Sequence, residues 1–445
     1  HERKESDLLM AKAQTVALPP RSRIERFGLE AVPQELRKTR WYEYVLIQVA
    51  FSVNAGNFLV PALAVIQGGL SFYAAFFSTI FGATLAFLFV SYLSLPGAER
   101  GIPSQFAIRS IIGVKGSRYI SSPIRTITSL YWFSVQTIGG TLVVQFILER
   151  AFQFSMPFYI IAMILALIMS GLALVGFDAV KRATKYFMPW LILGQLVMLF
   201  LLLTKGTGLG IEKTMDSGWN LPVMGFFASL AFVQYVSGVS SSADVTRYAV
   251  TSKQGFWGLF TGNVLGFILT AFFGAYTAHL TGAFNPFIAT SEMTNSGILT
   301  AIILGGAILS MVSINLSNAY TGGFSLLNSL PQLGRVKSSM IFGAAGILLS
   351  LSPALVEEAE RYISLIGAFV IPLSAVIITD FLFIKKKKIE VSEGLPSYNK
   401  IGFICIGIGI GAYFLLPEGL SPGFLASLIT AAIYFFTLKF VTHRR

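Results

Sequence analysis

The sequence has few charged residues and very little cysteine or histidine for its length. Only 12% of its 445 residues are charged, against about 25% in a typical soluble domain, while 54% are hydrophobic. There is one cysteine, Cys405, and there are three histidines, so disulfide frameworks and zinc sites are excluded. The absence of any Gly-Lys dipeptide also excludes a Walker A phosphate loop.

Long apolar runs take the place of these residues. A transmembrane helix needs about 20 apolar residues, and runs of this kind recur along the chain. They predict an all-α polytopic membrane protein with twelve transmembrane helices near 43–67, 71–95, 121–148, 157–177, 185–204, 221–243, 256–280, 297–326, 338–353, 361–384, 401–416 and 422–441. The glycines of the eleventh run indicate close helix packing, and they are Gly402, Gly407, Gly409 and Gly411.

The net charge of +12 reflects the predicted orientation of the chain in the membrane. When Lys and Arg are sorted between alternate loops, 29 of the 33 fall on the side of the N-terminal tail, residues 1–42. This bias predicts that both termini are cytoplasmic, in a multi-pass protein of the plasma membrane, and it makes a nucleic-acid partner unnecessary. The run Lys385–Lys388 is expected to anchor the end of the tenth span against anionic lipid.

Two spans carry polar interruptions where lipid offers no partners. The first contains Asn54, Gly56 and Asn57 near its middle, and the sixth contains residues 234–242, which include Tyr235 and four serines. Unsatisfied polar groups in hydrocarbon cost several kcal/mol each, so both helices should break there and face protein, ligand or water. Breaks at equivalent positions predict two inverted five-helix repeats, 43–204 and 221–384, followed by two helices over 401–441.

The third and eighth spans supply further candidate binding residues. Trp132 and Gln136 share one helix face, so an aromatic plane lies one turn from a two-way hydrogen-bonding amide, a pair that suits a flat heterocycle. On the eighth span, Ser313, Asn315 and Asn318 could offer oxygens to a sodium ion and hydrogen bonds to a ligand. Interhelical hydrogen bonding remains the alternative for this stretch.

Several motifs, in order and at their spacing, resemble the nucleobase-cation symporter family of purine, cytosine and hydantoin permeases. The similarity covers about residues 20 to 440, and the motifs are Ile24–Glu30, Gly97–Pro103, Arg109, Gly113–Gly116, Tyr131–Gln136, Ala243–Tyr248, Pro372 and Asp380. The resemblance implies a leucine-transporter-like fold with a 5+5 inverted repeat plus two C-terminal helices, and uptake of a planar base by alternating access.

The same resemblance implies roles for individual residues. Trp132 and Tyr235 would sandwich the ring, while Gln136, Asn315, Asn318 and Asn54 would contact its edge. Ser313 would ligate sodium, with Asn54 and Asn57 at the broken first helix. Sodium-coupled members carry two adjacent hydroxyl residues on the eighth helix, whereas Ile314 follows Ser313 here.

The coupling ion is therefore open between Na⁺ and a proton. An intramembrane acid is the default proton carrier, yet no Asp, Glu or His falls in the middle of a span; Asp244, near the inner end of the sixth, is the candidate. Asp244 and Arg247 lie three residues apart, and an ion pair between them would lock one gating state. No cofactor is expected, and no metal beyond sodium.

The leading hypothesis is a secondary active transporter, not an enzyme, that acts as a monomer and imports a nucleobase or a related planar heterocycle.

 A membrane enzyme would need His, Cys or paired carboxylates clustered near one interface, and a channel would need a polar stripe along whole spans. The sequence offers neither pattern. Within the transporter class, hydantoin, allantoin or a vitamin-like ring remains open as the substrate, and an amino acid would not explain the aromatic pair.

Overall fold

The computed structural model describes residues 27–174, 177–206, 218–389 and 394–443. Residues 1–26, which hold most of the expected tail and the Ile24–Arg26 part of one motif, lie outside the described residues. The fold is helical, with one isolated β-bridge, Thr39 to Ala249, in the described part of the chain. The principal helices are α2 (Trp41–Ser52), α3 (Leu59–Ile66), α4 (Phe72–Leu93), α8 (Ser122–Phe152), α9 (Phe158–Ala173), α10 (Phe177–Lys205), α11 (Leu221–Val236), α13 (Ser252–Thr281), α15 (Gly297–Ser329), α16 (Gly334–Leu349), α18 (Ala359–Thr379), α19 (Lys400–Leu415) and α20 (Pro422–His443).

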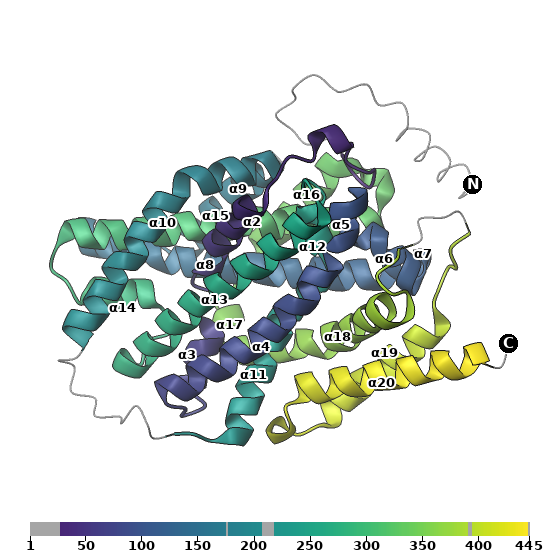
Figure 1. Ribbon diagram of the computed structural model, residues 1–445. Coiled ribbons are helices and arrows are strands. Elements are labelled where there is room, and N and C mark those ends of the chain that lie inside the picture. The colour runs from purple at the N-terminus through teal and green to yellow at the C-terminus, as the bar shows by residue number, and fades with distance from the viewer. Residues whose placement is uncertain (1–26, 175–176, 207–217, 390–393, 444–445) are drawn as a thin grey trace.

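A helix lies within each of the twelve apolar runs. Eight described stretches of helix are long and apolar enough to cross a membrane by length and composition, and α9 and α19 are shorter apolar helices. The helices lie roughly along one direction in Figure 1, with α19 and α20 side by side at one edge. The structure therefore confirms a multi-pass helical membrane protein.

The two expected helix breaks are both present. The first span is divided into α2 and α3, with residues 53–58 between them. In the sixth span, α11 ends at Val236 and is followed by the short helix η4 (Ser237–Ser240) and by α12 (Ser242–Thr246). The polar residues that predicted the breaks occupy them, because side chains there can satisfy backbone groups that the helix leaves free.

A row of glycines brings α13 against α2. A Cβ atom added at Gly258 would lie 2.5 Å from the carbonyl oxygen of Trp41, and one at Gly266 would lie 2.5 Å from the Cβ atom of Ser52. A Cβ atom at Gly262, midway between them, would lie 2.8 Å from the Cα atom of Val45. A spacing of four residues places these glycines on one face of α13. The backbones of α13 and α2 therefore pack closely along α2 as far as the break that follows it.

Short helices that the apolar runs did not predict form the connections. They are α5 (Leu95–Arg100), α6 (Ser104–Ile112) and α7 (Val114–Gly116) before α8, α14 (Pro286–Glu292) before α15, and α17 (Ala354–Glu357) before α18. Their length is below that of a span, so hydropathy does not detect them.

The connection before α19 is fastened to α6 and α7. The amides of Val114 and Lys115 donate to the carbonyls of Pro396 and Ser397 at 3.0 and 2.9 Å, and the Asn399 amide donates to Ile112. Gly113 has a φ of 90°, and a Cβ there would lie 2.6 Å from the Ser397 carbonyl oxygen. Only glycine fits this turn, which ties the C-terminal pair of helices to the loop between α4 and α8.

Candidate functional site

A cavity of about 170 Å³ lies where the two helix breaks meet. We call it the central cavity. Cavities of about 150 Å³ can hold a benzene ring, so this volume suits one small ring. Its walls come from α2, α4, α8, the α11–η4–α12 segment, α13 and α15, and its lining includes Gln48, Ser52, Asn57, Phe87, Arg125, Trp132, Gln136, Gln234, Tyr235, Ser237, Ser242, Asn263, Ser317 and Asn318.

The two expected aromatic residues both line the central cavity. Trp132 comes from the middle of α8, and its ring contacts Tyr131 edge-on at 5.0 Å. Tyr235 comes from the last turn of α11 and packs against Phe87 and Phe267, with ring centroids 4.8 and 5.1 Å away. Each ring is thus held by neighbours other than its expected partner, and both present surface to the same space.

Some of the buried polar atoms without a partner belong to residues that line this cavity. In the described residues, the Gln234 Oε1 atom, the Tyr235 hydroxyl and the Ser242 Oγ atom have no hydrogen-bond partner, and all three residues line it. Buried polar atoms in folded proteins are nearly always bonded, since an unmade bond costs about 1–3 kcal/mol. A polar ligand in the cavity would supply the missing partners.

The amides of the first span serve its break. Asn57 donates from Nδ2 to the Ser52 carbonyl at 2.8 Å, and Asn54 accepts from the Asn57 amide at 2.9 Å. Gln136 donates to the Asn54 Oδ1 atom and accepts from the Gly56 amide at 3.2 Å. Asn54 does not line the cavity, so these side chains hold the unwound backbone; Gln136 and Asn57 lie at its edge.

The eighth-span candidates divide in the same way. Asn318 lines the central cavity, whereas Asn315 lies behind it and donates to the Phe133 carbonyl at 3.0 Å and to the Thr137 hydroxyl at 3.1 Å. Asn318 in turn donates to Asn315 at 3.1 Å. Ser313 is outside the lining, and its hydroxyl donates to the Leu309 carbonyl of its own helix at 2.9 Å. Interhelical bonding thus accounts for Asn315.

Arg125 is a cavity residue that the sequence reasoning missed. It lies on α8 and lines the central cavity, and its side chain is buried. It is seven residues before Trp132, two helical turns, and so lies on the same face. That spacing was the available signal, but a basic residue near the end of a span was counted only as evidence of orientation.

Asp244 and Arg247 do not form the expected ion pair, because each is engaged elsewhere. Asp244 accepts from the Ser104 amide at 2.7 Å, while Arg247 donates to the carbonyls of Gly28, Glu30 and Gly101. The two ion pairs in the described residues join other side chains. Asp244 is buried, and the Ser104 bond and the nearby arginines Arg247 and Arg125 favour its charged form. Both residues fasten the connections before α8 to α12.

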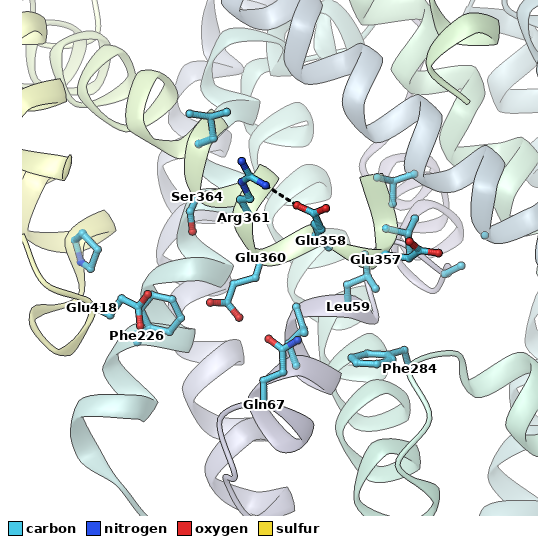
Figure 2. A pocket seen from close by; sticks show the side chains of 18 of the residues that line it. Leu59, Gln67, Phe226, Phe284, Glu357, Glu358, Glu360, Arg361, Ser364 and Glu418 are labelled. Atoms are coloured by element: carbon cyan, nitrogen blue, oxygen red, sulfur yellow. Dashed lines mark hydrogen bonds and ion pairs between the residues drawn. The ribbon is translucent and has the colours of Figure 1, made fainter. Parts of the chain in front are cut away.

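A second, larger cavity of about 1130 Å³ opens at the end of the molecule that carries α17; we call it the wide cavity. Ala55, Val135 and Gly139 line it, so the first-span break and Gln136 lie between it and the central cavity. Figure 2 shows acidic side chains around it, among them Glu360 and Glu418, with Glu358 held by Arg361 at 2.7 Å. The two cavities thus lie on opposite sides of the first-span break.

Comparison with known proteins identifies the kind of molecule to which this geometry belongs. Residues 31–399 match the model of a family described as permeases for cytosine and purines, uracil, thiamine and allantoin. A hydantoin permease of Microbacterium maritypicum is 23% identical over 422 residues, which are 88% of this chain and 83% of that protein. A cytosine permease of Escherichia coli K12 is also 23% identical, over 95% of this chain and 96% of its own.

Solved structures agree on the fold. The structure of Mhp1, a nucleobase-cation-symport-1 family transporter in a closed conformation with bromovinylhydantoin bound, superposes with a TM-score of 0.79. The match is 17% identical and covers 95% of this chain and 97% of that one. An inward-facing conformation of Mhp1 gives a TM-score of 0.73. A Na⁺-coupled sialic acid symporter gives 0.64, at 14% identity, over 98% of this chain.

Proposed function

This chain belongs to the family of permeases for cytosine and purines, uracil, thiamine and allantoin, and from that premise we propose that it imports one small planar nitrogen heterocycle through the central cavity. The observation that carries the proposal is the cavity itself: two aromatic rings and three buried polar atoms without partners surround a volume of about 170 Å³. The aromatic rings would stack on the faces of the ring, and the polar atoms would bind its edge. The relatives named above, a hydantoin permease and a cytosine permease, support this class of substrate.

The transport cycle in this proposal is alternating access around the central cavity. The chain would form twelve spans, in two inverted five-helix repeats over 43–204 and 221–384 with two further helices over 401–441, and both termini would be cytoplasmic. The likeness to Mhp1 and the broken first and sixth spans support this arrangement. The wide cavity would then open to the outside, and Asp244 and Arg247 would close the inner end.

A cation gradient would drive uptake. A sodium ion would be held by carbonyls of the broken first span, near Asn54 and Asn57, together with Ser313. A proton would instead be carried by Asp244, the buried acid near the inner end of the sixth span. Either ion can drive uptake only through a difference in its affinity for the outward and inward states. Anionic lipid would bind at Lys385–Lys388, with the protein acting as a monomer.

Thermal shifts of the purified protein test the function directly. A panel of uracil, cytosine, hydantoin, allantoin, adenine and hypoxanthine is added with and without sodium, at several pH values. We expect at least one single-ring compound to raise the melting temperature, because a ligand that binds only the folded state stabilises it. Uptake into proteoliposomes with an imposed sodium or pH gradient then identifies the coupling ion.

Trp132→Ala provides the matched test of the site. Stacking on aromatic side chains contributes about 1–3 kcal/mol per base, so the variant should bind the hit roughly tenfold more weakly. Trp257→Ala, a change to an exposed tryptophan of α13, should leave binding unchanged. If no heterocycle stabilises the protein, or if Trp132→Ala binds as tightly as wild type, the proposal is wrong.

A further inference from the structure

Arg125 places a guanidinium group beside the central cavity. Its Nε and Nη2 atoms donate to the Ser129 hydroxyl at 3.0 and 2.9 Å, and its Nη1 atom donates to the Ser237 carbonyl at 3.1 Å. Ser129 lies one turn further along α8, toward Trp132, so these bonds hold the Arg125 side chain along the helix in that direction. The group is thereby held between α8 and the sixth-span break.

The guanidinium keeps one donor for a further partner. It carries five N–H groups in a fixed fork and no acceptor. Its bonds to Ser129 and to Ser237, whose hydroxyl also lies 3.4 Å from Nη1, use at most four of them. The remaining N–H is on Nη2, and it has no hydrogen-bond acceptor in the described part of the chain.

The charge of Arg125 is also uncompensated at short range. Neither ion pair found in the described residues includes it, and all the acceptors it uses are neutral. Asp244, the carboxylate whose field reaches it, gives one oxygen to the Ser104 amide. A buried charge is costly unless it is paired or well bonded, so an oxygen with negative character in the cavity would bind strongly there.

An acceptor of the opposite kind lines the same cavity. The Nε2 atom of Gln234 donates to the Asn57 Oδ1 atom at 3.3 Å, which fixes the orientation of the amide and leaves Oε1 buried without a partner. The central cavity thus presents a charged donor and a neutral acceptor. A ring that carries N–H next to C=O, a lactam edge, has the complementary pair of groups.

We propose that Arg125 binds the carbonyl oxygen of a lactam edge on the transported ring while Gln234 accepts its N–H, so that the cavity selects lactam heterocycles over amino-substituted rings without an oxo group. This inference rests on the proposed function and assigns the edge that the site reads. An amino group facing the guanidinium would set donor against donor and leave the charge without an acceptor. Sites built to bond a polar group reject ligands that lack it.

Matched ligand pairs test the selection on the wild-type protein. Dissociation constants are measured by isothermal titration for uracil against 2-aminopyrimidine and 4-aminopyrimidine, and for hypoxanthine against adenine. A hydrogen bond to a charged group contributes about 1.5–3 kcal/mol, so the lactam member of each pair should bind at least tenfold more tightly. Equal or tighter binding of the oxo-free member overturns the inference.

Variants of Arg125 distinguish a direct hydrogen bond to the ligand from a purely structural role. Arg125→Gln should reduce the lactam preference at least tenfold, and Arg125→Lys should retain part of it, because the charge remains but the fork is lost. Arg361→Gln makes the same change at the exposed rim of the wide cavity and should leave the ratio unchanged. A role confined to tying α8 to the sixth-span break would weaken both members of a pair equally.

Two further outcomes are decisive. If Arg125→Gln fails to fold, Ser129→Ala replaces it; loss of the hydroxyl that orients the guanidinium should lower the preference while both ligand classes still bind. If heterocycles bind to wild type with no lactam preference, only the role of Arg125 is wrong. If no heterocycle binds at all, the proposed function fails together with it.

Discussion

At the scale of single residues, three side chains that line the central cavity each have a buried polar atom without a hydrogen-bond partner. The Tyr235 hydroxyl is buried without a partner, whereas the buried Tyr44 hydroxyl donates to the Val245 carbonyl at 3.1 Å. Without ligand, the buried Tyr235 hydroxyl therefore lowers the stability of the folded state, whereas the bonded Tyr44 hydroxyl raises it. A site that bonds a ligand edge is destabilised until the ligand arrives.

The substitution Tyr235→Phe should consequently have opposite effects on stability and on binding. Removing a hydroxyl that has no partner should leave the melting temperature of the free protein unchanged or raise it. Loss of one hydrogen bond to the ligand, about 0.5–1.5 kcal/mol, should weaken binding roughly three- to tenfold. Tyr44→Phe is the control: it should lower the melting temperature and leave affinity unchanged. A fall in stability with no change in affinity for Tyr235→Phe would contradict this reading.

The same residues show how far the sequence could define the site. Trp132 could be placed because a large aromatic at mid-span has no interfacial role, and Tyr235 because the family resemblance implies an aromatic at the sixth-span break. Both line the cavity. Asn54 and Asn315 were assigned to the ligand edge, yet they bond to neighbouring side chains and to backbone. Whether a mid-span amide bonds to the backbone or to a ligand depends on the distances between helices. Those distances cannot be deduced from residue spacing along one helix.

At the scale of elements, the breaks could be predicted and the helix contacts only in part. A helix break is one of the few structures that can accommodate a run of small and polar residues in hydrocarbon. The breaks in the first and sixth spans could therefore be predicted. The glycines of α19 were all expected to pack. A Cβ at Gly409 would meet the Thr430 hydroxyl and, at 2.7 Å, the Pro372 Cβ atom, whereas one at Gly407 would have no neighbour within 4 Å. Which glycines face a neighbouring helix depends on how α19 is rotated about its own axis, and the sequence of α19 alone does not determine that rotation.

This difference within α19 gives a matched pair of substitutions. Gly409→Ala should lower stability by about 1–3 kcal/mol, because a methyl group has no room between α18 and α20. Gly407→Ala should be neutral or stabilising by about 0.5–1 kcal/mol, since alanine favours a helix and meets open space. Melting temperatures in one detergent measure both. Equal effects of the two substitutions would show that α19 is rotated from the orientation described.

At the scale of the whole molecule, the two ends differ in closure. The wide cavity opens beside α17, while at the opposite end hydrogen bonds join segments distant in sequence. There, Arg247 donates to the carbonyls of Gly28, Glu30 and Gly101, and Asn328 joins α15 to Arg109 and Ser122. If the N-terminal side is cytoplasmic, these bonds lie at the inner end, and opening that end requires them to break.

Cysteine accessibility in vesicles of known orientation measures this asymmetry. Cys405 is buried and is replaced by alanine to give a background without thiols. In that background Ala55→Cys, in the wide cavity, should react with a polar maleimide applied outside, and Ser241→Cys, in the central cavity, should resist the reagent applied inside. Adding Arg247→Lys keeps the charge but not the fork that reaches three carbonyls, so Ser241→Cys should react from the inside about tenfold faster. If inside labelling does not increase while the variant remains folded, Arg247 does not hold the inner end closed, and the gate must be sought among the bonds of Asn328.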